Sequence, residues 1–444
     1  AFARLWVLAN EPRDAASLAA FRVFFGLLGF FGALRFLVYG WIDQFFGEPS
    51  FFFSYWGLEF VPVLPPSQLK VVFVVLAALS MLVALGLFYR VAIVLWLVVF
   101  SYVEALDVTN YLNHYYLLSV LGFWMCFMPL GRTYGLDGKF FGARTTLPTW
   151  MITALRFQVG CVYFYAGIAK LTGDWLLHAQ PLAIWLHART DTPFVGSFFD
   201  QTWVAYAMSW GGFFFDTTIA GWLLWGRTRR YAYAVLVGFH VAVGYLFPIG
   251  LFPWIMIASA TVFFPASWPR FGRAKKEDDA RPVRTSRVLI AGLTVFALFQ
   301  FLMPLRTFAY GGNVLWHEQG MRWSWRVLCR EKNGSVSYRV QVDGRRREFQ
   351  VPPSRYLTAQ QEREMSSQPD LILQLAHHIA GDFRRRGYEG VEVRVDALVS
   401  LNGRRPARMI DPDADLARIE DGIGRADWIL PAPTDSPPHF ANKE

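Results

Sequence analysis

Residues 149–171 read TWMITALRFQVGCVYFYAGIAKL. The stretch is apolar and long enough for a helix to cross the roughly 30 Å hydrocarbon core of a bilayer. Lys170 lies near its carboxyl end, and an ammonium at membrane depth is costly, which makes this lysine a candidate functional group. The competing interpretation is a lysine that snorkels from the end of the helix to the lipid headgroups.

Apolar runs of this kind continue through the first 309 positions of the chain. Hydrophobic residues make up 54% of the 444 residues, whereas charged residues make up 17%, a balance typical of membrane proteins. Hydropathy places candidate spans near 17–40, 69–88, 91–108, 111–130, 149–171, 203–226, 231–247, 249–266 and 288–309. The sequence therefore predicts a polytopic α-helical membrane protein with about nine spans.

Basic residues gather in every second loop between these spans. They are Arg90, then Arg132, Lys139 and Arg144, then Arg227, Arg229 and Arg230, then Arg270, Arg273, Lys275, Lys276, Arg281 and Arg284. The loop at 41–68 contains no Lys or Arg. By the positive-inside rule, the basic loops and the N-terminus are cytoplasmic, and residues 310–444 lie on the opposite side. We interpret the net charge of +9 as an orientation signal, since no motif favours nucleic-acid binding.

Beyond Pro304 the composition becomes that of a soluble domain. Three segments mix β-branched and aromatic residues with polar ones, as half-buried strands do: 321–329, 335–342 and 390–400. Residues 369–386 have the apolar spacing of an amphipathic helix that ends at Gly387.

The chain is therefore expected to have three parts. Residues 1–309 form a transmembrane helical catalytic domain, 310–430 an extracytoplasmic α+β domain of mostly antiparallel sheet, and 431–444 a flexible Pro-rich tail. Of the three cysteines, Cys126 and Cys161 fall in predicted spans, so no disulfide framework is implied. The spacing of Cys and His also indicates no metal site.

Polar residues of other spans are expected at the depth of Lys170. The alternating topology puts Asn113 and His114 near the outer end of the fourth span and His240 in the middle or outer half of the seventh. These groups predict a pocket that opens toward the soluble domain. Each has a structural alternative, since His and Asn in membranes also hydrogen-bond between helices. Asp216 is a further charge within a span, and the sequence assigns it no partner.

Several motifs occur in a fixed order along the chain. The membrane region contains Asn113-His114-Tyr115-Tyr116-Leu117, Ala166-Gly167-x-x-Lys170-Leu171-x-x-Asp174-Trp175, Phe239-His240, Leu246-Phe247-Pro248-Ile249-Gly250-Leu251-Phe252 and Ser267-Trp268-Pro269. The soluble region contains Trp323-Ser324-Trp325 and Val399-Ser400-Leu401-Asn402 followed by Asp411-Pro412. Together they resemble the vitamin K-dependent γ-glutamyl carboxylase family, including its bacterial relatives with a horizontally transferred transmembrane domain.

The resemblance implies a role for each candidate residue. Lys170, as a neutral amine, would remove a proton from reduced vitamin K, a hydroquinone such as menaquinol. His114 and Asn113 would hydrogen-bond the quinone oxygens and stabilise developing negative charge. His240 would support them, and Phe252 would line the apolar pocket for the cofactor.

The resemblance also implies the reaction and its partners. O₂-driven epoxidation of the quinol would generate a base strong enough to remove the γ-proton of Glu in an exported peptide or protein, and the carbanion would capture CO₂. The implied enzyme is a carbon–carbon bond-forming lyase that uses no metal. Its partners would be the lipid bilayer, a lipid-soluble quinol and the Glu-containing substrate.

Two other interpretations remain open from the sequence. One is a quinol epoxidase with a non-Glu or unknown substrate, and the other is a non-enzymatic quinone-binding membrane protein or transporter. Internal repeats and paired broken helices would favour transport, and the sequence contains no evident example of either. The expected location is a bacterial inner or plasma membrane, or the endoplasmic reticulum membrane in a eukaryote.

Overall fold

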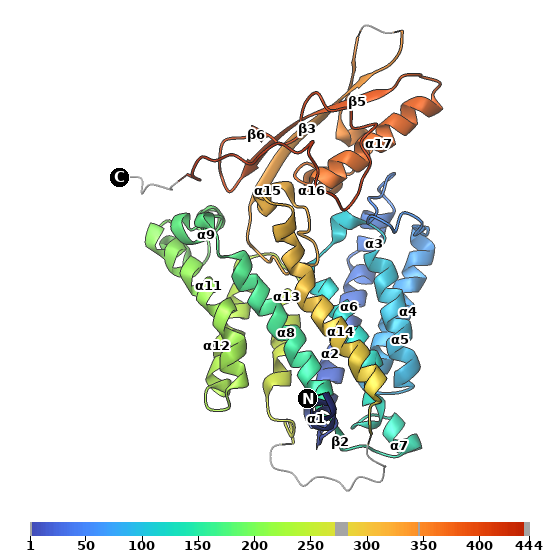
Figure 1. The fold of residues 1–444 in the computed structure, drawn as a ribbon, viewed down its shortest axis with the longest axis vertical. Coiled ribbons are helices and arrows are strands. Elements are labelled where there is room, and N and C mark those ends of the chain that lie inside the picture. Colours follow the sequence, from blue (N-terminus) through green and yellow to red (C-terminus); the bar gives the residue numbers. More distant parts are fainter. Residues whose placement is uncertain (1, 271–282, 345–346, 439–444) are drawn as a thin grey trace.

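The computed structural model describes residues 2–270, 283–344 and 347–438. A bundle of helices forms one end of the molecule, and an antiparallel sheet forms the other (Figure 1). The N-terminal helix α1 (Phe2–Ala9) lies at the end of the bundle far from the sheet (Figure 1). The basic residues Arg273, Lys275, Lys276 and Arg281 and the last part of the expected tail, 439–444, lie outside the described residues.

The bundle is built from helices of very different lengths. The longer ones are α2 (Ala16–Val38), α4 (Pro66–Leu85), α5 (Tyr89–Glu104), α6 (Asn113–Cys126), α8 (Thr149–Ala169), α11 (Thr202–Leu224), α12 (Arg229–Leu246), α13 (Phe252–Ala260) and α14 (Arg287–Leu302). The short helices between them are α3 (Trp41–Phe46), α7 (Asp137–Phe141), α9 (Gly173–His178) and α10 (Leu182–His187). Strands β1 (Pro12–Asp14) and β2 (Thr146–Pro148) pair as a separate small sheet.

Within the described ranges, four helical segments are long and apolar enough to cross a membrane: Ala16–Val38, Pro66–Leu85, Thr149–Ala169 and Arg287–Ala309. Phe252–Phe263 is a shorter apolar helix at one of the other predicted spans. Large apolar side chains such as Val288 and Phe308 are exposed, at 83% and 65%. An extended apolar exterior of this kind is typical of a surface that faces lipid. The membrane-like helical region is thus confirmed, and the count of nine spans stays a prediction.

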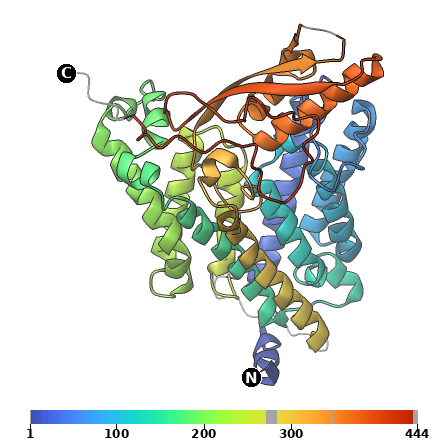
Figure 2. The same ribbon diagram turned by 45° about the horizontal axis from the view of Figure 1, so that its top comes forward.

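The antiparallel domain predicted at the C-terminal end is confirmed. Strand β3 (Lys332–Gln341) pairs with β4 (Phe349–Val351) and β5 (Glu392–Leu401), and β5 pairs with β6 (Ala407–Arg408). Burial alternates along β5, because one face of the sheet packs on α17 (Pro369–Arg385). Figure 2 shows α17 along this face of the sheet. Two expected strands and the expected helix therefore form where their patterns indicate.

Side chains of the sheet domain attach it to the bundle. Gln361 of α16 (Ala359–Met365) donates through Nε2 to Oδ2 of Asp107 at 2.9 Å. Gln374 of α17 exchanges hydrogen bonds with the backbone of Ser54, at 3.0 and 3.1 Å. These contacts hold the sheet domain over the end of the bundle where α8 ends and α9 begins (Figure 1).

Residues 321–329 do not form the predicted strand. They form turns and irregular backbone after α15 (Val314–His317), with Trp323, Trp325 and Leu328 at φ values of 60°, 58° and 49°. The Trp325 ring stacks on Tyr116 with centroids 4.7 Å apart, and the Trp323 amide donates to the Tyr111 hydroxyl. Residues 321–329 alternate aromatic and polar side chains because the segment packs between the two domains. Side chains of the bundle, and not a neighbouring strand, hydrogen-bond to its backbone.

Candidate functional site

Lys170 directly follows the last residue of α8 and is 5% exposed. Its Nζ lies 2.8 Å from Oδ2 of Asp216 on α11, and the Asp216 residue is itself only 7% exposed. The same Nζ donates to the carbonyl oxygens of Ala166 and Val327, at 3.2 and 3.3 Å. Each member of a buried ion pair depends on the other, because a lone buried charge is costly. Lys170 therefore lies inside the protein with a defined partner and does not snorkel outward.

A glycine allows α8 and α11 to approach closely enough for this pair. A Cβ atom added to Gly167 would lie 2.5 Å from Cγ2 of Thr217 and 3.0 Å from its backbone nitrogen. Thr217 is next to Asp216, so the close contact at Gly167 sets the carboxylate beside the ammonium. The motif around Ala166-Gly167-x-x-Lys170 thus has a reason in helix packing as well as in chemistry.

An apolar cavity of about 70 Å³ lies beside the ion pair. Lys170, His240 of α12 and Phe252 of α13 line it together with Asp216. The Tyr163 hydroxyl lies 2.8 Å from Nε2 of His240. Nδ1 of the same imidazole is buried and has no hydrogen-bond partner in the described part of the chain. An unsatisfied buried nitrogen costs on the order of 1–3 kcal/mol, so this atom is available to bind a polar group of a ligand.

The residues of the first motif lie at the border of this cavity. The ring centroid of Phe252 is 5.9 Å from that of His114 and 5.7 Å from that of His240, so one phenyl ring contacts both imidazoles. Asn113 donates through Nδ2 to the carbonyl oxygen of Arg326 at 3.2 Å. Asn113 and Lys170 therefore bind the carbonyl groups of two consecutive residues. The structure brings Lys170, His240 and Phe252 into one cavity and sets His114 and Asn113 next to it.

A second, polar cavity of about 260 Å³ adjoins the first. The residues common to both linings are Trp185 and Leu328, which form the boundary between the two spaces. The polar residues of the second lining include Asn113, Glu318, Arg322, Arg326, Arg330, Glu364 and Gln368. An apolar space with a buried lysine thus lies beside a charged space that is lined by residues of both the bundle and the sheet domain.

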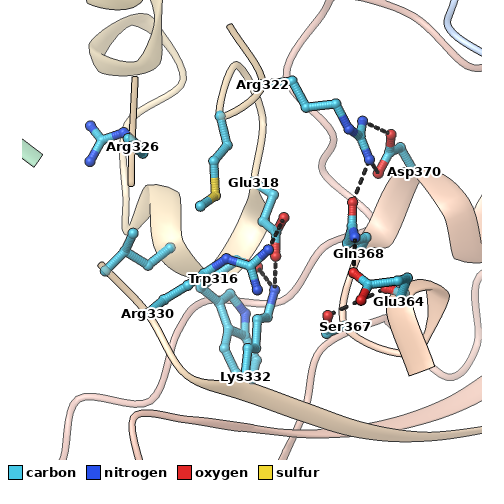
Figure 3. Close-up of polar contacts among 12 residues, drawn as sticks. Trp316, Glu318, Arg322, Arg326, Arg330, Lys332, Glu364, Ser367, Gln368 and Asp370 are labelled. Atoms are coloured by element: carbon cyan, nitrogen blue, oxygen red, sulfur yellow. Dashed lines mark hydrogen bonds and ion pairs between the residues drawn. The ribbon is translucent and has the colours of Figure 1, made fainter. Parts of the chain in front are cut away.

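Most charges near the polar cavity are paired, as Figure 3 shows. Glu318 binds Arg330 at 2.9 Å and Lys332 at 3.0 Å, and Arg322 binds Asp370. Burial lowers the pKa of Lys332 to about 8, although Glu318 opposes this change. These pairs hold the wall of the cavity in place and leave little free charge on it.

Arg326 differs from its neighbours because it has no carboxylate partner among the described residues. Its Nη2 donates to the Thr307 hydroxyl at 3.3 Å, and its Nε is buried with no hydrogen-bond partner within the part of the chain that the structure describes. Figure 3 shows its side chain apart from the paired cluster. Burial lowers the pKa of Arg326, as expected for a guanidinium that has lost water without gaining an anion. Such a group binds an incoming carboxylate through charge-assisted hydrogen bonds.

Asp216 and Arg326 are the residues of this site whose roles the sequence does not reveal. Each role depends on contacts between segments that are far apart in the chain. The one signal for Asp216 is its charge within an apolar span, and Arg326 is one arginine among 43 basic residues.

Two family models match the chain, and together they cover both of its structural parts. The HTTM domain matches residues 10–268, which include most of the helical bundle. The lumenal domain of vitamin K-dependent gamma-carboxylase matches residues 285–435, which include the sheet domain. No solved structure was found to match the chain. The two matches, in this order along one polypeptide, establish that the chain belongs to the vitamin K-dependent gamma-glutamyl carboxylase family.

Proposed function

We propose that the protein is a vitamin K hydroquinone-dependent carboxylase, which couples O₂-driven epoxidation of reduced vitamin K to carboxylation of peptide Glu to γ-carboxyglutamate. Membership of the family supports vitamin K-dependent carboxylation as the general activity. The observation that carries the specific proposal is the buried Lys170 in an apolar cavity that is also lined by His240, whose Nδ1 has no hydrogen-bond partner among the described residues.

The residues of the apolar cavity fit a hydroquinone in chemistry. Aromatic and aliphatic side chains, including Phe239, Phe247 and Phe252, make up most of the lining. Nδ1 of His240 has no hydrogen-bond partner among the described residues and is proposed to meet a phenolic oxygen, and Lys170 lines the same cavity. When bound, reduced vitamin K supplies the acidic hydroxyl and, with O₂ as co-substrate, the driving force for proton removal from Glu. The apolar lining excludes water from these groups.

Lys170 is proposed to act as the base, with Asp216 as its assistant. A lysine must be neutral to accept a proton. Once Lys170 takes the proton, the carboxylate of Asp216 at 2.8 Å stabilises the resulting ammonium. The carbonyl oxygens of Ala166 and Val327 accept its remaining hydrogen bonds.

The other candidates are proposed to bind and orient the quinol. Tyr163 holds one nitrogen of His240, which leaves Nδ1 to meet a quinol oxygen. Phe252 packs against the ring system of the quinol. His114 and Asn113 stabilise negative charge on the quinone oxygens from the border of the cavity.

We further propose that the Glu side chain of the substrate enters the polar cavity, where its carboxylate binds Arg326. The two cavities meet at Trp185 and Leu328, so a side chain in the polar cavity lies next to the quinol site. Arg326 is the guanidinium of this wall whose charge has no partner in the described ranges. This arrangement favours carboxylation over epoxidation alone.

Arg326→Gln is expected to raise the KM for a Glu-containing peptide about tenfold to a hundredfold, because a charge-assisted hydrogen bond contributes roughly 1.5–3 kcal/mol. The KM for the quinol should change much less. Steady-state carboxylation with varied peptide measures both values. Arg394→Gln is the matched control, since Arg394 pairs with Glu392 at 2.8 Å on the sheet and does not line either cavity. An unchanged peptide KM in Arg326→Gln would contradict the role of Arg326.

Incorporation of labelled bicarbonate into a Glu peptide, with and without reduced vitamin K, tests the proposed function as a whole. Incorporation that requires the quinol supports a carboxylase. Epoxide formation without incorporation indicates an epoxidase with another substrate. Quinone binding without either product indicates a non-enzymatic quinone-binding protein or transporter.

We also propose that the N-terminus is cytoplasmic, that the bundle crosses the membrane nine times and that the sheet domain is extracytoplasmic, in a bacterial inner or plasma membrane. In support, helix α7, which belongs to the loop with Arg132, Lys139 and Arg144, and the N-terminal α1 lie at the end of the bundle away from the sheet (Figure 1). A membrane-impermeant maleimide added to spheroplasts should label Ser335→Cys and leave Arg227→Cys unlabelled until the cells are lysed. Labelling of Arg227→Cys before lysis would show that the protein has the opposite orientation in the membrane.

A further inference from the structure

A turn of the sheet domain binds the first turn of α9, which follows Lys170 in the chain. Nη1 and Nη2 of Arg404 donate to Oδ2 and Oδ1 of Asp174 at 2.6 Å each, a bidentate pair. Asn402 donates through Nδ2 to the same carboxylate at 2.7 Å. Arg404 is 9% exposed and Asn402 is fully buried, so the contact lies inside the interface between the two domains.

The carboxylate of Asp174 is well suited to such a contact. Burial opposes its ionisation, but the hydrogen bonds from Arg404 and Asn402 outweigh burial and lower the pKa of Asp174. The hydrogen bonds that Arg404 donates to Asp174 raise the pKa of Arg404 in turn. The pair is therefore ionised at neutral pH, and bidentate geometry fixes the orientation of the carboxylate as well as its position.

Trp175, the residue after Asp174, lies against the side chain of Lys170. The ring of Trp175 lies 5.1 Å from Nζ of Lys170, and Trp175 also lines the apolar cavity. Its indole nitrogen donates to the carbonyl oxygen of Ser209 at 2.8 Å. The first turn of α9 is thus held on one side by the sheet domain and on the other by α11, with the indole ring against the amine.

The same turn of the sheet domain also holds the boundary of the two cavities. The backbone amide of Glu331 donates to Oδ1 of Asn402 at 2.9 Å. Oε2 of Glu331 accepts a hydrogen bond from the indole nitrogen of Trp185 at 2.6 Å. One cluster in the sheet domain therefore contacts segments that carry both Trp175 and Trp185.

We propose that Arg404 and Asn402 are positioning residues: they clamp Asp174 and thereby hold Trp175 against the amine of Lys170. The inference rests on the proposed role of Lys170 as the proton acceptor. It assigns to the sheet domain a part in assembling the site of the bundle, in addition to the residues that it contributes to the polar cavity.

The effect of loosening this clamp can be separated from loss of the domain interface. Gln361 and Gln374 attach the sheet domain to Asp107 and Ser54 independently of Arg404. A variant without the clamp therefore keeps its fold and its domain contact. The ring and the amine then lose their fixed distance, and a displacement of about 1 Å near a reacting group can lower the rate by up to a hundredfold.

The experiment compares Arg404→Gln, Arg404→Lys and the charge-reversed double variant Asp174→Arg with Arg404→Asp. Arg408→Gln is the matched control, because Arg408 pairs with Asp396 at 3.3 Å on the exposed face of the same sheet. Three quantities are measured in the full chain: the kcat and KM of quinol epoxidation, hydrogen exchange of residues 172–178, and the rate at which acetic anhydride acylates Lys170, followed by mass spectrometry.

Arg404→Gln is expected to lower kcat about tenfold to a hundredfold with a nearly unchanged quinol KM. Exchange of residues 172–178 should rise, and the acylation rate of Lys170 should change several-fold. Arg404→Lys and the charge-reversed variant should recover part of the loss, and Arg408→Gln should equal the wild type.

Two results would contradict the proposal that Arg404 and Asn402 act as positioning residues. One is unchanged exchange of residues 172–178 in Arg404→Gln, and the other is raised exchange with kcat and Lys170 acylation at wild-type values. If the wild type itself forms no epoxide, the proposed function fails, whereas exchange and acylation still decide whether Arg404 positions the lysine.

Discussion

Lys170→Ala is expected to abolish quinol epoxidation, with a loss of about a thousandfold or more, while the protein stays folded. General base catalysis by a positioned side chain contributes roughly 10²–10⁴-fold, and this variant removes the base together with the hydrogen bonds that place it. Chromatographic measurement of vitamin K epoxide gives the rate, and circular dichroism with a thermal melt reports the fold. Epoxide formation at the wild-type rate would refute the assignment of Lys170.

Lys170→Ala leaves the carboxylate of Asp216 buried without its partner, so a control variant is needed that also removes this charge. Removal of one member of a buried pair costs about 3–5 kcal/mol, because the other charge remains buried without a partner. The double variant Lys170→Ala with Asp216→Asn removes that charge and should be folded and equally inactive. Lys70→Ala is the matched surface control, since Lys70 binds Asp43 at the same 2.8 Å but with both side chains at least half exposed. It should retain wild-type activity.

Asp216→Asn is expected to lower the kcat of epoxidation about a hundredfold, with little change in the KM for the quinol. Asn has nearly the shape of Asp but lacks the charge that stabilises the ammonium formed on Lys170. Loss of one electrostatic partner of a developing charge typically costs 10²–10³-fold in rate. The loss should be smaller than in Lys170→Ala, because the amine itself is still present.

Steady-state epoxidation with varied quinol separates kcat from KM in this variant. Asp43→Asn serves as the surface control. A rate at or above that of the wild type would show that Asp216 restrains Lys170 by keeping it protonated, and the proposed assistance would then be wrong.

Much of the fold follows from patterns that extend over a few neighbouring residues. The apolar runs at 149–171 and 288–309 coincide with helices able to cross a membrane. The pattern at 369–386 predicts α17, and the alternation at 390–400 predicts β5. Such patterns are visible because a helix or strand buries residues at a fixed spacing along its own length.

The segment 321–329 shows where this reasoning fails. Its residues have the composition of a strand, but Tyr111, Asn113 and Lys170 bind its backbone in place of a neighbouring strand. Those donors and acceptors come from the bundle, so no pattern within the segment indicates them.

Local patterns in the chain are enough to predict a helical membrane protein with an antiparallel soluble domain, to mark Lys170 as an unusual charge in an apolar span, and to show motifs that resemble those of a carboxylase family. The tertiary structure alone decided which charges meet: Lys170 with Asp216 across a glycine contact, Asp174 with Arg404 across the domain interface, and Arg326 with no carboxylate partner in the described ranges. Spacing along one element shows which side chains share a face, whereas a buried pair depends on how two distant elements pack, and that information is not present in either segment alone.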